Sequence, residues 1–171
     1  VQGGALTARP GVRRLIAEAR AAGLRLGLAT SSQRLSVENM VPVVLGPGAL
    51  SWFDAIGCGD DVARKKPQPD VYLHVLDRLG LTADECVAIE DTELGLAAAV
   101  AAGIPTVVTV ASYSGGDDFT GATVVLSCLG DPGEPMVVLA GGGRDSECPS
   151  GAVADVARLR EWQRVGLRRE T

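Results

Sequence analysis

Hydroxyl-bearing residues follow an apolar stretch near the start of the chain. Residues 24–29 read Leu-Arg-Leu-Gly-Leu-Ala, which is typical of a short buried strand, and Thr30, Ser31 and Ser32 come directly after it. A hydroxyl and consecutive backbone N–H groups at the end of a strand can bind a phosphate oxygen. The same residues also suit a turn or the N-cap of a helix, so the sequence leaves both interpretations open.

The two lysines of the chain, Lys65 and Lys66, are adjacent, whereas the other fourteen basic residues are arginine. Both lysines precede an expected helix over residues 70–79. A compact ammonium on a flexible stem suits a point contact with a phosphoryl group or a carboxylate. Solvated surface charge is the alternative, and spacing does not show which lysine points inward.

Two adjacent carboxylates, Glu90 and Asp91, end the apolar run 86–89. At the mouth of a buried strand they repel each other unless a cation offsets their charge. Mg²⁺ takes one or two carboxylates, keeps several waters and completes its shell with phosphate oxygens. The pair could instead stabilise the start of the next helix, where negative charge suits the helix dipole.

The elements that position these residues alternate along the chain. We expect strands over 24–29, 55–59, 86–89, 106–110 and 123–126, and helices over 10–22, 70–79, 93–102 and 153–165. This order predicts an α/β fold, a doubly wound parallel sheet with helices on both faces. Ligands of such sheets bind outside the carboxyl ends of the strands, which is where all three clusters fall.

Composition limits the classes of function. The 171 residues suffice for one domain, and a formal net charge of -5 leaves no basic face for nucleic acid or an anionic membrane. No transmembrane helix is expected, because Gly103 and Pro105 interrupt the uncharged stretch 94–116. The four cysteines are scattered and His74 is the single histidine, so we expect idle thiols, a reducing compartment and no zinc site.

The texture of the sequence divides the chain. We expect a core over residues 1–130, a linker rich in glycine and proline over 131–152, and a terminal helix and tail over 153–171.

In this order and at these separations, the clusters at Thr30, Lys66 and Glu90-Asp91 resemble motifs two, three and four of the haloacid dehalogenase (HAD) superfamily. The likeness runs from about Arg9 to Pro132 and is most similar to the CbbY-type and β-phosphoglucomutase-like sugar-phosphate enzymes. The segments that carry it are Gly59-Asp-Asp-Val62, Lys65-Lys-Pro-x-Pro-Asp-Val-Tyr72, Glu90-Asp-Thr-x-x-Gly-Leu96, Thr106-Val-Val-Thr-x-x-x-Tyr113 and Asp118-Phe119.

The resemblance implies a Rossmann-like three-layer α/β/α core and Mg²⁺-dependent hydrolysis of a small sugar phosphate or bisphosphate through an aspartyl-phosphate intermediate. Thr30 and Ser31 would bind the phosphoryl group, Lys66 would neutralise phosphate and nucleophile, and Glu90 and Asp91 would bind Mg²⁺ directly or through water. A sugar-phosphate mutase is the enzymatic alternative. A non-catalytic protein that binds phosphate or Mg²⁺, or offers an interaction surface, is the other.

The chain departs from the family at its first motif. Asp-x-Asp, which supplies the family's nucleophile and general acid/base, occurs nowhere in it. We therefore expect a C-terminal portion of such an enzyme, without the first central strand and the helical cap, and inactive alone. The absent strand lies between the strands that end at Thr30 and Asp91, so we expect unpaired edges and self-association. The expected compartment is cytoplasmic, or a plastid for a photosynthetic eukaryote.

Overall fold

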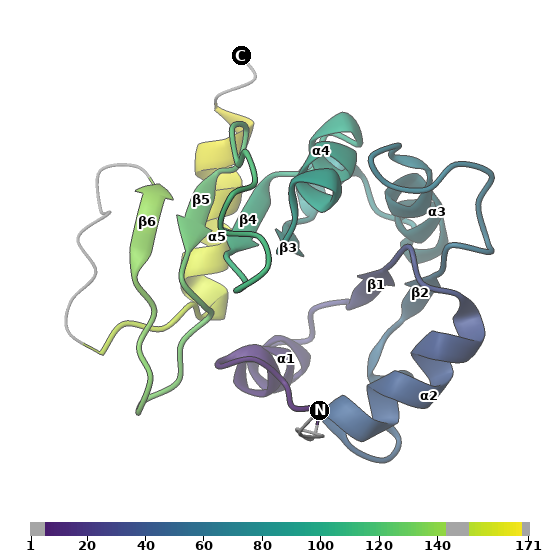
Figure 1. Cartoon of the computed structure of the whole chain (residues 1–171), viewed down its shortest axis with the longest axis horizontal. Helices are drawn as coiled ribbons and strands as arrows, with labels where there is room; N and C mark the ends of the chain where they lie inside the picture. The colour runs from purple at the N-terminus through teal and green to yellow at the C-terminus, as the bar shows by residue number, and fades with distance from the viewer. Residues whose placement is uncertain (1–5, 143–150, 169–171) are drawn as a thin grey trace.

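The strands that the structure describes fall into two hydrogen-bonded groups (Figure 1). The computed structural model describes residues 6–142 and 151–168. The strands are β1 (Gly27–Ala29), β2 (Ala55–Gly57), β3 (Ala88–Glu90), β4 (Thr106–Thr109), β5 (Val124–Leu126) and β6 (Val138–Gly141). The α-helices are α1 (Val12–Ala21), α2 (Arg34–Leu45), α3 (Asp70–Leu79), α4 (Glu93–Ala101) and α5 (Val156–Leu167), with short 3₁₀ turns at Ala49–Trp52 and Ala83–Glu85.

Parallel pairing dominates both sheets. β1 pairs with β2 in one, and the order β3-β4-β5-β6 makes up the other. All pairs are parallel except β5 with β6, which is antiparallel and carries an irregularity in register between Val125 and Leu126. The expected α/β fold with a parallel sheet is therefore confirmed, with one antiparallel strand at its edge.

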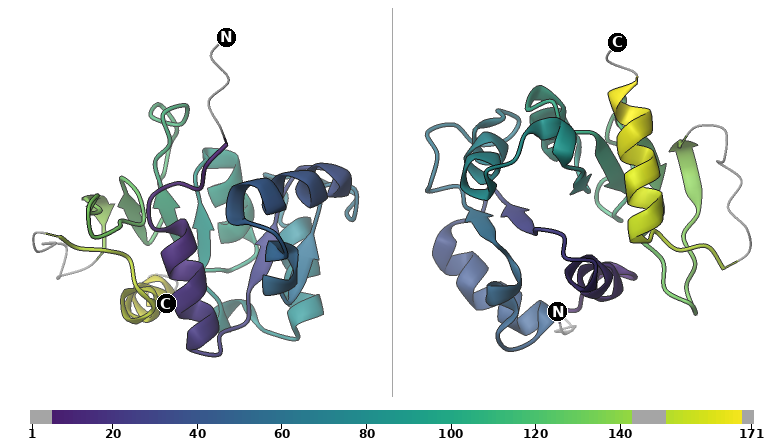
Figure 2. Two further views of the ribbon diagram at one scale, coloured as in Figure 1. Left: turned by 90° about the horizontal axis from the view of Figure 1, so that it is seen from below. Right: turned by 180° about the vertical axis from the view of Figure 1, so that it is seen from behind.

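Helices cover both faces of the four-stranded sheet. Val107 and Val108 of β4 are both fully buried, and successive strand residues face opposite sides. Val107 packs in a cluster with Leu159 and Trp162 of α5, whereas Val108 packs against Leu96 of α4. Seen from behind, α5 lies across the sheet (Figure 2). The result is the three-layer arrangement that the sequence analysis expected.

The two-stranded sheet is sandwiched in the same way, and two glycines set its spacing. A Cβ on Gly27 would lie 2.6 Å from Val75 Cγ1, and one on Gly57 would lie 2.8 Å from Val75 Cγ2. Helix α3 therefore packs directly on the backbone of β1 and β2, an approach that a larger residue would prevent. On the opposite face Leu28 and Ile56 pack against α2.

Two elements were not predicted from the sequence. Helix α2 buries Val37, Val41 and Leu45, but Pro42 lies inside it, and proline is a helix-breaking signal. Strand β6 lies within 131–152, where turns and a linker were expected. It was missed because a four-residue edge strand depends on its partner β5 rather than on a local pattern.

The chain beyond residue 130 packs on the same core as the rest. Met136 and Ala152 are buried in the cluster that contains Val107. Arg14 of α1 donates hydrogen bonds to the carbonyl oxygens of Leu129, Gly130 and Ala154 at 2.8–3.1 Å. The division into core, linker and terminal helix stays a prediction, and residues 143–150 of the expected linker lie outside the described residues.

Strands β1 and β3 each have a single hydrogen-bonded neighbour within the described residues, β2 and β4 respectively. The middle residue of β3, Ile89, is 39% exposed between two buried residues. An unpaired strand edge that carries an apolar side chain is a template for pairing with another chain.

We expect the chain to self-associate through these edges. Replacing Ile89 with Lys should weaken the association, because a charge on an edge strand opposes further pairing. Sedimentation velocity over a range of concentrations measures the effect, and Leu73→Lys, on the exposed side of α3, is the matched control. A monodisperse, cooperatively unfolding monomer of the unsubstituted chain would refute the expectation.

Candidate functional site

The predicted site residues gather at the carboxyl ends of β1 and β3. Thr30 follows the last residue of β1, Glu90 is the last residue of β3, and Asp91 comes next. Lys66 arrives from the loop before α3. The two strands belong to different sheets among the described residues, and it is Lys66, rather than strand pairing, that connects their carboxyl ends.

Lys66 is the lysine that points inward. Its Nζ donates to the carbonyl oxygen of Ala29 at 3.1 Å and forms a short charge-assisted hydrogen bond with Glu90 Oε1. The two side chains are only 11% and 8% exposed, whereas Lys65 is exposed. The Lys66 ammonium also lies 4.7 Å from the centre of the Tyr72 ring, within cation–π range. The ammonium therefore joins the ends of the two sheets.

Glu90 is fully engaged on one oxygen. Besides Lys66, the Tyr72 hydroxyl donates to Glu90 Oε1. Burial raises the pKa of Tyr72, and the Glu90 carboxylate raises it further. The hydroxyl therefore stays protonated and remains a donor. On the other side a Cβ at Gly95 would collide with Glu90 Oε2, so only glycine at this position of α4 leaves room for the carboxylate.

The residues around Thr30 form a tight turn that leads into α2. Thr30 Oγ1 accepts a hydrogen bond from the backbone N–H of Ser32 at 3.1 Å, and the N–H of Gly59 donates to the carbonyl oxygen of Ser32 at 2.8 Å. A Cβ at Gly59 would collide with the backbone of Ser31. The Thr30 hydroxyl therefore stabilises the turn, which is one of the two interpretations that the sequence left open. Its own proton is still available for a phosphate oxygen, because a hydroxyl both donates and accepts.

Asp91 is half-buried and has a different partner. The hydroxyl of Tyr113, from the loop after β4, donates to Asp91 Oδ2 at 2.5 Å. This hydrogen bond raises the pKa of Tyr113. No role for Tyr72 or Tyr113 was predicted from the sequence. The signals that could have found them are their places in two of the segments that carry the resemblance and their rarity, since they are the two tyrosines of the chain.

The donor set fits a hard divalent cation at Asp91. The charge of Glu90 is offset by Lys66, whereas Asp91 carries a negative charge with a neutral partner on one of its oxygens. Carboxylate oxygens are the protein ligands that Mg²⁺ prefers. Glu90, bonded through Oε1 to Lys66 and Tyr72, stays a predicted member of the cation site.

A second group of acidic residues has a structural explanation. Ligand atoms of Cys58, Asp60 and Asp61 lie within 4.8 Å of one another. Asp61 accepts from the Cys58 backbone N–H and pairs with Arg34, and Asp60 accepts from the Arg34 backbone N–H. The hydrogen bond from Cys58, and after it the Arg34 guanidinium, lower the pKa of Asp61. Burial raises the pKa of Cys58. The group fastens the start of α2.

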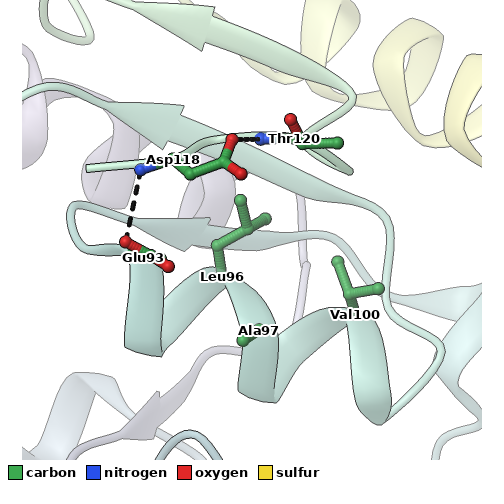
Figure 3. A pocket seen from close by; sticks show the side chains of 6 residues that line it. All are labelled: Glu93, Leu96, Ala97, Val100, Asp118 and Thr120. Atoms are coloured by element: carbon green, nitrogen blue, oxygen red, sulfur yellow. Dashed lines mark hydrogen bonds between the residues drawn. The ribbon is translucent and has the colours of Figure 1, made fainter. Parts of the chain in front are cut away.

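A shallow pocket lies along α4, apart from these residues (Figure 3). Glu93, Leu96, Ala97, Val100, Asp118 and Thr120 line it. The backbone N–H of Asp118 donates to Glu93 Oε2 at 3.3 Å, and its carboxylate accepts from the backbone N–H of Thr120 at 2.8 Å. None of the predicted site residues borders this pocket.

No helix among the described residues is both long and apolar enough to span a membrane.

Comparison with known proteins decides the family. Residues 2–109 match the model of the haloacid dehalogenase-like hydrolases. The chain belongs to this family. It is 48% identical to the plasmid-encoded protein CbbY of Cupriavidus necator over 164 residues, which cover 95% of this chain and 61% of that protein. The family match includes Thr30, Lys66, Glu90 and Asp91.

Solved structures agree with this assignment. The complex of a CbbY variant from Rhodobacter sphaeroides with xylulose 1,5-bisphosphate shares the fold with a TM-score of 0.72 and 39% identity, over 77% of this chain and 58% of that one. A candidate β-phosphoglucomutase from Thermotoga maritima matches with a TM-score of 0.58 and 32% identity, over 62% of this chain and 48% of that one. The chain thus spans between one half and about three fifths of the length of the CbbY proteins that it matches.

We predict that Lys66 and Glu90 are strongly coupled in stability. Lys66→Met or Glu90→Gln alone should each cost about 3–5 kcal/mol of unfolding free energy, because the partner's charge or hydrogen bond stays buried without compensation. The double variant should lose less than the sum by at least about 1 kcal/mol. Urea unfolding of the four chains measures this difference.

The Arg64–Asp70 ion pair is the matched control, since the Arg64 side chain is 65% exposed. The cycle of Arg64→Met and Asp70→Asn should give a coupling of only about 0.2–1 kcal/mol. Additive losses in the Lys66–Glu90 cycle would contradict the structural role of the bridge.

Proposed function

We propose that this chain is the phosphate- and cation-binding part of a phosphatase core that acts on a small sugar phosphate or bisphosphate. The observation that carries the proposal is the inward Lys66 ammonium between the ends of β1 and β3. Thr30 and the Asp91 carboxylate follow those two strand ends. A cation, a hydroxyl and a carboxylate that can bind a metal ion, all at the carboxyl ends of parallel strands, suit a phosphoryl group.

The Lys66 ammonium is already held in place by its contacts with Ala29 and Glu90. An ammonium has three N–H donors, and the Ala29 carbonyl and Glu90 accept two of them. The third is available to a phosphate oxygen. Because the ion pair fixes the ammonium before a ligand arrives, the electrostatic stabilisation of the phosphoryl group costs little reorganisation.

Asp91, together with Glu90 as predicted, would hold Mg²⁺. A bound Mg²⁺ would supply further positive charge against the phosphate oxygens. The Lys66 ammonium and Mg²⁺ would both reduce the repulsion between an anionic phosphate and the anionic nucleophile that approaches it.

The class of substrate follows the relatives. A CbbY variant from Rhodobacter sphaeroides was solved with xylulose 1,5-bisphosphate, and a Thermotoga maritima relative, 37% identical over 100 residues, is a phosphorylated carbohydrates phosphatase. We propose a small phosphorylated sugar for this chain as well. A mutase is the second candidate, because the structural likeness extends to the candidate β-phosphoglucomutase. Transfer of phosphate within the sugar, rather than its release, would distinguish the mutase.

This chain lacks the carboxylate that carries out nucleophilic attack in the family. The sequence contains no Asp-x-Asp, which supplies the carboxylate nucleophile in the family that it resembles. Phosphate-monoester hydrolysis needs an acceleration of up to about 10²¹-fold. We therefore propose that residues 1–171 bind phosphate but do not release it from an ester.

The cytoplasmic or plastid location stays a prediction.

Two measurements test this proposal. Calorimetric titration with inorganic phosphate should give binding that Lys66→Ala weakens and Lys65→Ala leaves unchanged, because Lys65 is exposed. Circular dichroism confirms that each variant is folded. If Lys66→Ala fails to fold, the variant that joins Lys66→Met with Glu90→Gln replaces it. Equal affinities of the Lys65 and Lys66 variants would overturn the phosphate role of Lys66.

The second measurement is phosphate release from xylulose 1,5-bisphosphate with Mg²⁺. We expect none from residues 1–171. If the reading frame upstream of Val1 encodes an Asp-x-Asp strand, the longer chain should release phosphate and lose this activity on Asp91→Ala. Turnover by residues 1–171 that depends on Mg²⁺ and Lys66 would show that the proposed need for Asp-x-Asp is wrong.

A further inference from the structure

The two tyrosines of the chain each donate a hydrogen bond to one of the two adjacent carboxylates. Tyr72 reaches Glu90 from the buried side of α3, and Tyr113 reaches Asp91 from the loop after β4. The two contacts come from unrelated parts of the fold. Neither contact is accounted for by the roles given above to Lys66 and Thr30.

Packing does not explain the position of Tyr113. Its side chain is 71% exposed, so the burial of its ring contributes little. An exposed tyrosine hydroxyl can bond to water equally well. What fixes its place is the loop that carries it and the directional bond to Asp91 Oδ2.

The loop is anchored on both sides of Tyr113. Ser114 is 1% exposed, and its Oγ accepts from the backbone N–H of Ala111 at 2.9 Å. Further along, Asp117 Oδ2 accepts from the backbone N–H of Glu93 at 2.9 Å. Glu93 is the first residue of α4, two residues after Asp91. The start of α4 therefore positions both the carboxylate and the tyrosine that binds it.

The two carboxylates are left in different states. Glu90 Oε1 receives both the Lys66 ammonium and the Tyr72 hydroxyl, and Oε2 faces Gly95. Asp91 receives a neutral donor on Oδ2, and its charge is not offset by an ion pair among the described residues. A hydrogen bond to one oxygen of a carboxylate fixes its rotation and leaves the other oxygen to coordinate a metal.

We propose that Tyr113 is a positioning residue that orients the Asp91 carboxylate for a divalent cation. This inference rests on the proposed function only in that Asp91 is taken to bind the cation. The Tyr113 hydroxyl acts through Asp91. Outer partners of metal ligands are worth about 10–100-fold in metal affinity.

The test is a titration of the whole 171-residue chain with Mn²⁺, a spectroscopic substitute for Mg²⁺. The electron paramagnetic resonance signal of the free ion measures how much Mn²⁺ is bound. Tyr113→Phe removes the hydroxyl and keeps the ring. We expect it to weaken Mn²⁺ binding about 10-fold. Thermal unfolding without the cation should not change, because the ring is exposed. Together these readouts separate a positioning role from a structural one.

Two further variants complete the design. Ser112→Ala, at the exposed neighbour of Tyr113, should bind Mn²⁺ as the parent does, and Asp91→Asn should lose binding. If the parent binds, Asp91→Asn does not, and Tyr113→Phe binds as the parent does, the role of Tyr113 is overturned while the cation site stands. If the parent does not bind Mn²⁺, or Asp91→Asn binds as tightly as the parent, the cation site fails and the role of Tyr113 with it.

Discussion

The Lys66 ammonium ties the end of β1 to the end of β3, and the site depends on this link. Within residues 6–142 and 151–168 the two sheets share no strand pairing, so no backbone ladder there fixes their carboxyl ends to each other. Lys66 contacts the Ala29 carbonyl on one side and Glu90 on the other. A buried charge is tolerated only when it is paired and hydrogen-bonded, and this geometry meets that condition.

Side-chain packing supports the same link from one face. Tyr72 and Leu76 of α3 share a buried cluster with Ala88 of β3 and Ala98 of α4. The alanines of α4 let α3 lie close to it. Because Tyr72 is part of this cluster and also donates to Glu90, the packing of the helical layer sets the position of the carboxylate.

Glu90 and Asp91 illustrate how environment separates two identical functional groups. Adjacent carboxylates in one environment would repel each other. Here the strand end places Glu90 among Lys66, Tyr72 and α4, whereas Asp91 lies half-buried beyond it with the Tyr113 hydroxyl. Glu90 therefore anchors the Lys66 ammonium, whereas no ion pair offsets the charge of Asp91 among the described residues, as the proposed metal site requires.

The sequence by itself determined the alternation of strands and helices, the family, and the three polar clusters at strand ends, because hydrophobic periodicity and short motifs are local properties. It did not determine α2, in which Pro42 hides the helical pattern, or β6, whose existence depends on pairing with β5. Spacing also could not choose between Lys65 and Lys66.

Tertiary structure alone decided which groups meet. Lys66 lies 24 positions from Glu90, and Tyr113 lies 22 positions from Asp91, so no local pattern announces either bond. The Tyr113–Asp91 bond arises because β3 and β4 are parallel neighbours whose carboxyl ends lie side by side. The Lys66–Glu90 bond arises because the loop before α3 reaches the ends of both sheets. The separation of β1 from β3 was different in kind, because the resemblance already implied it by placing an absent strand between them.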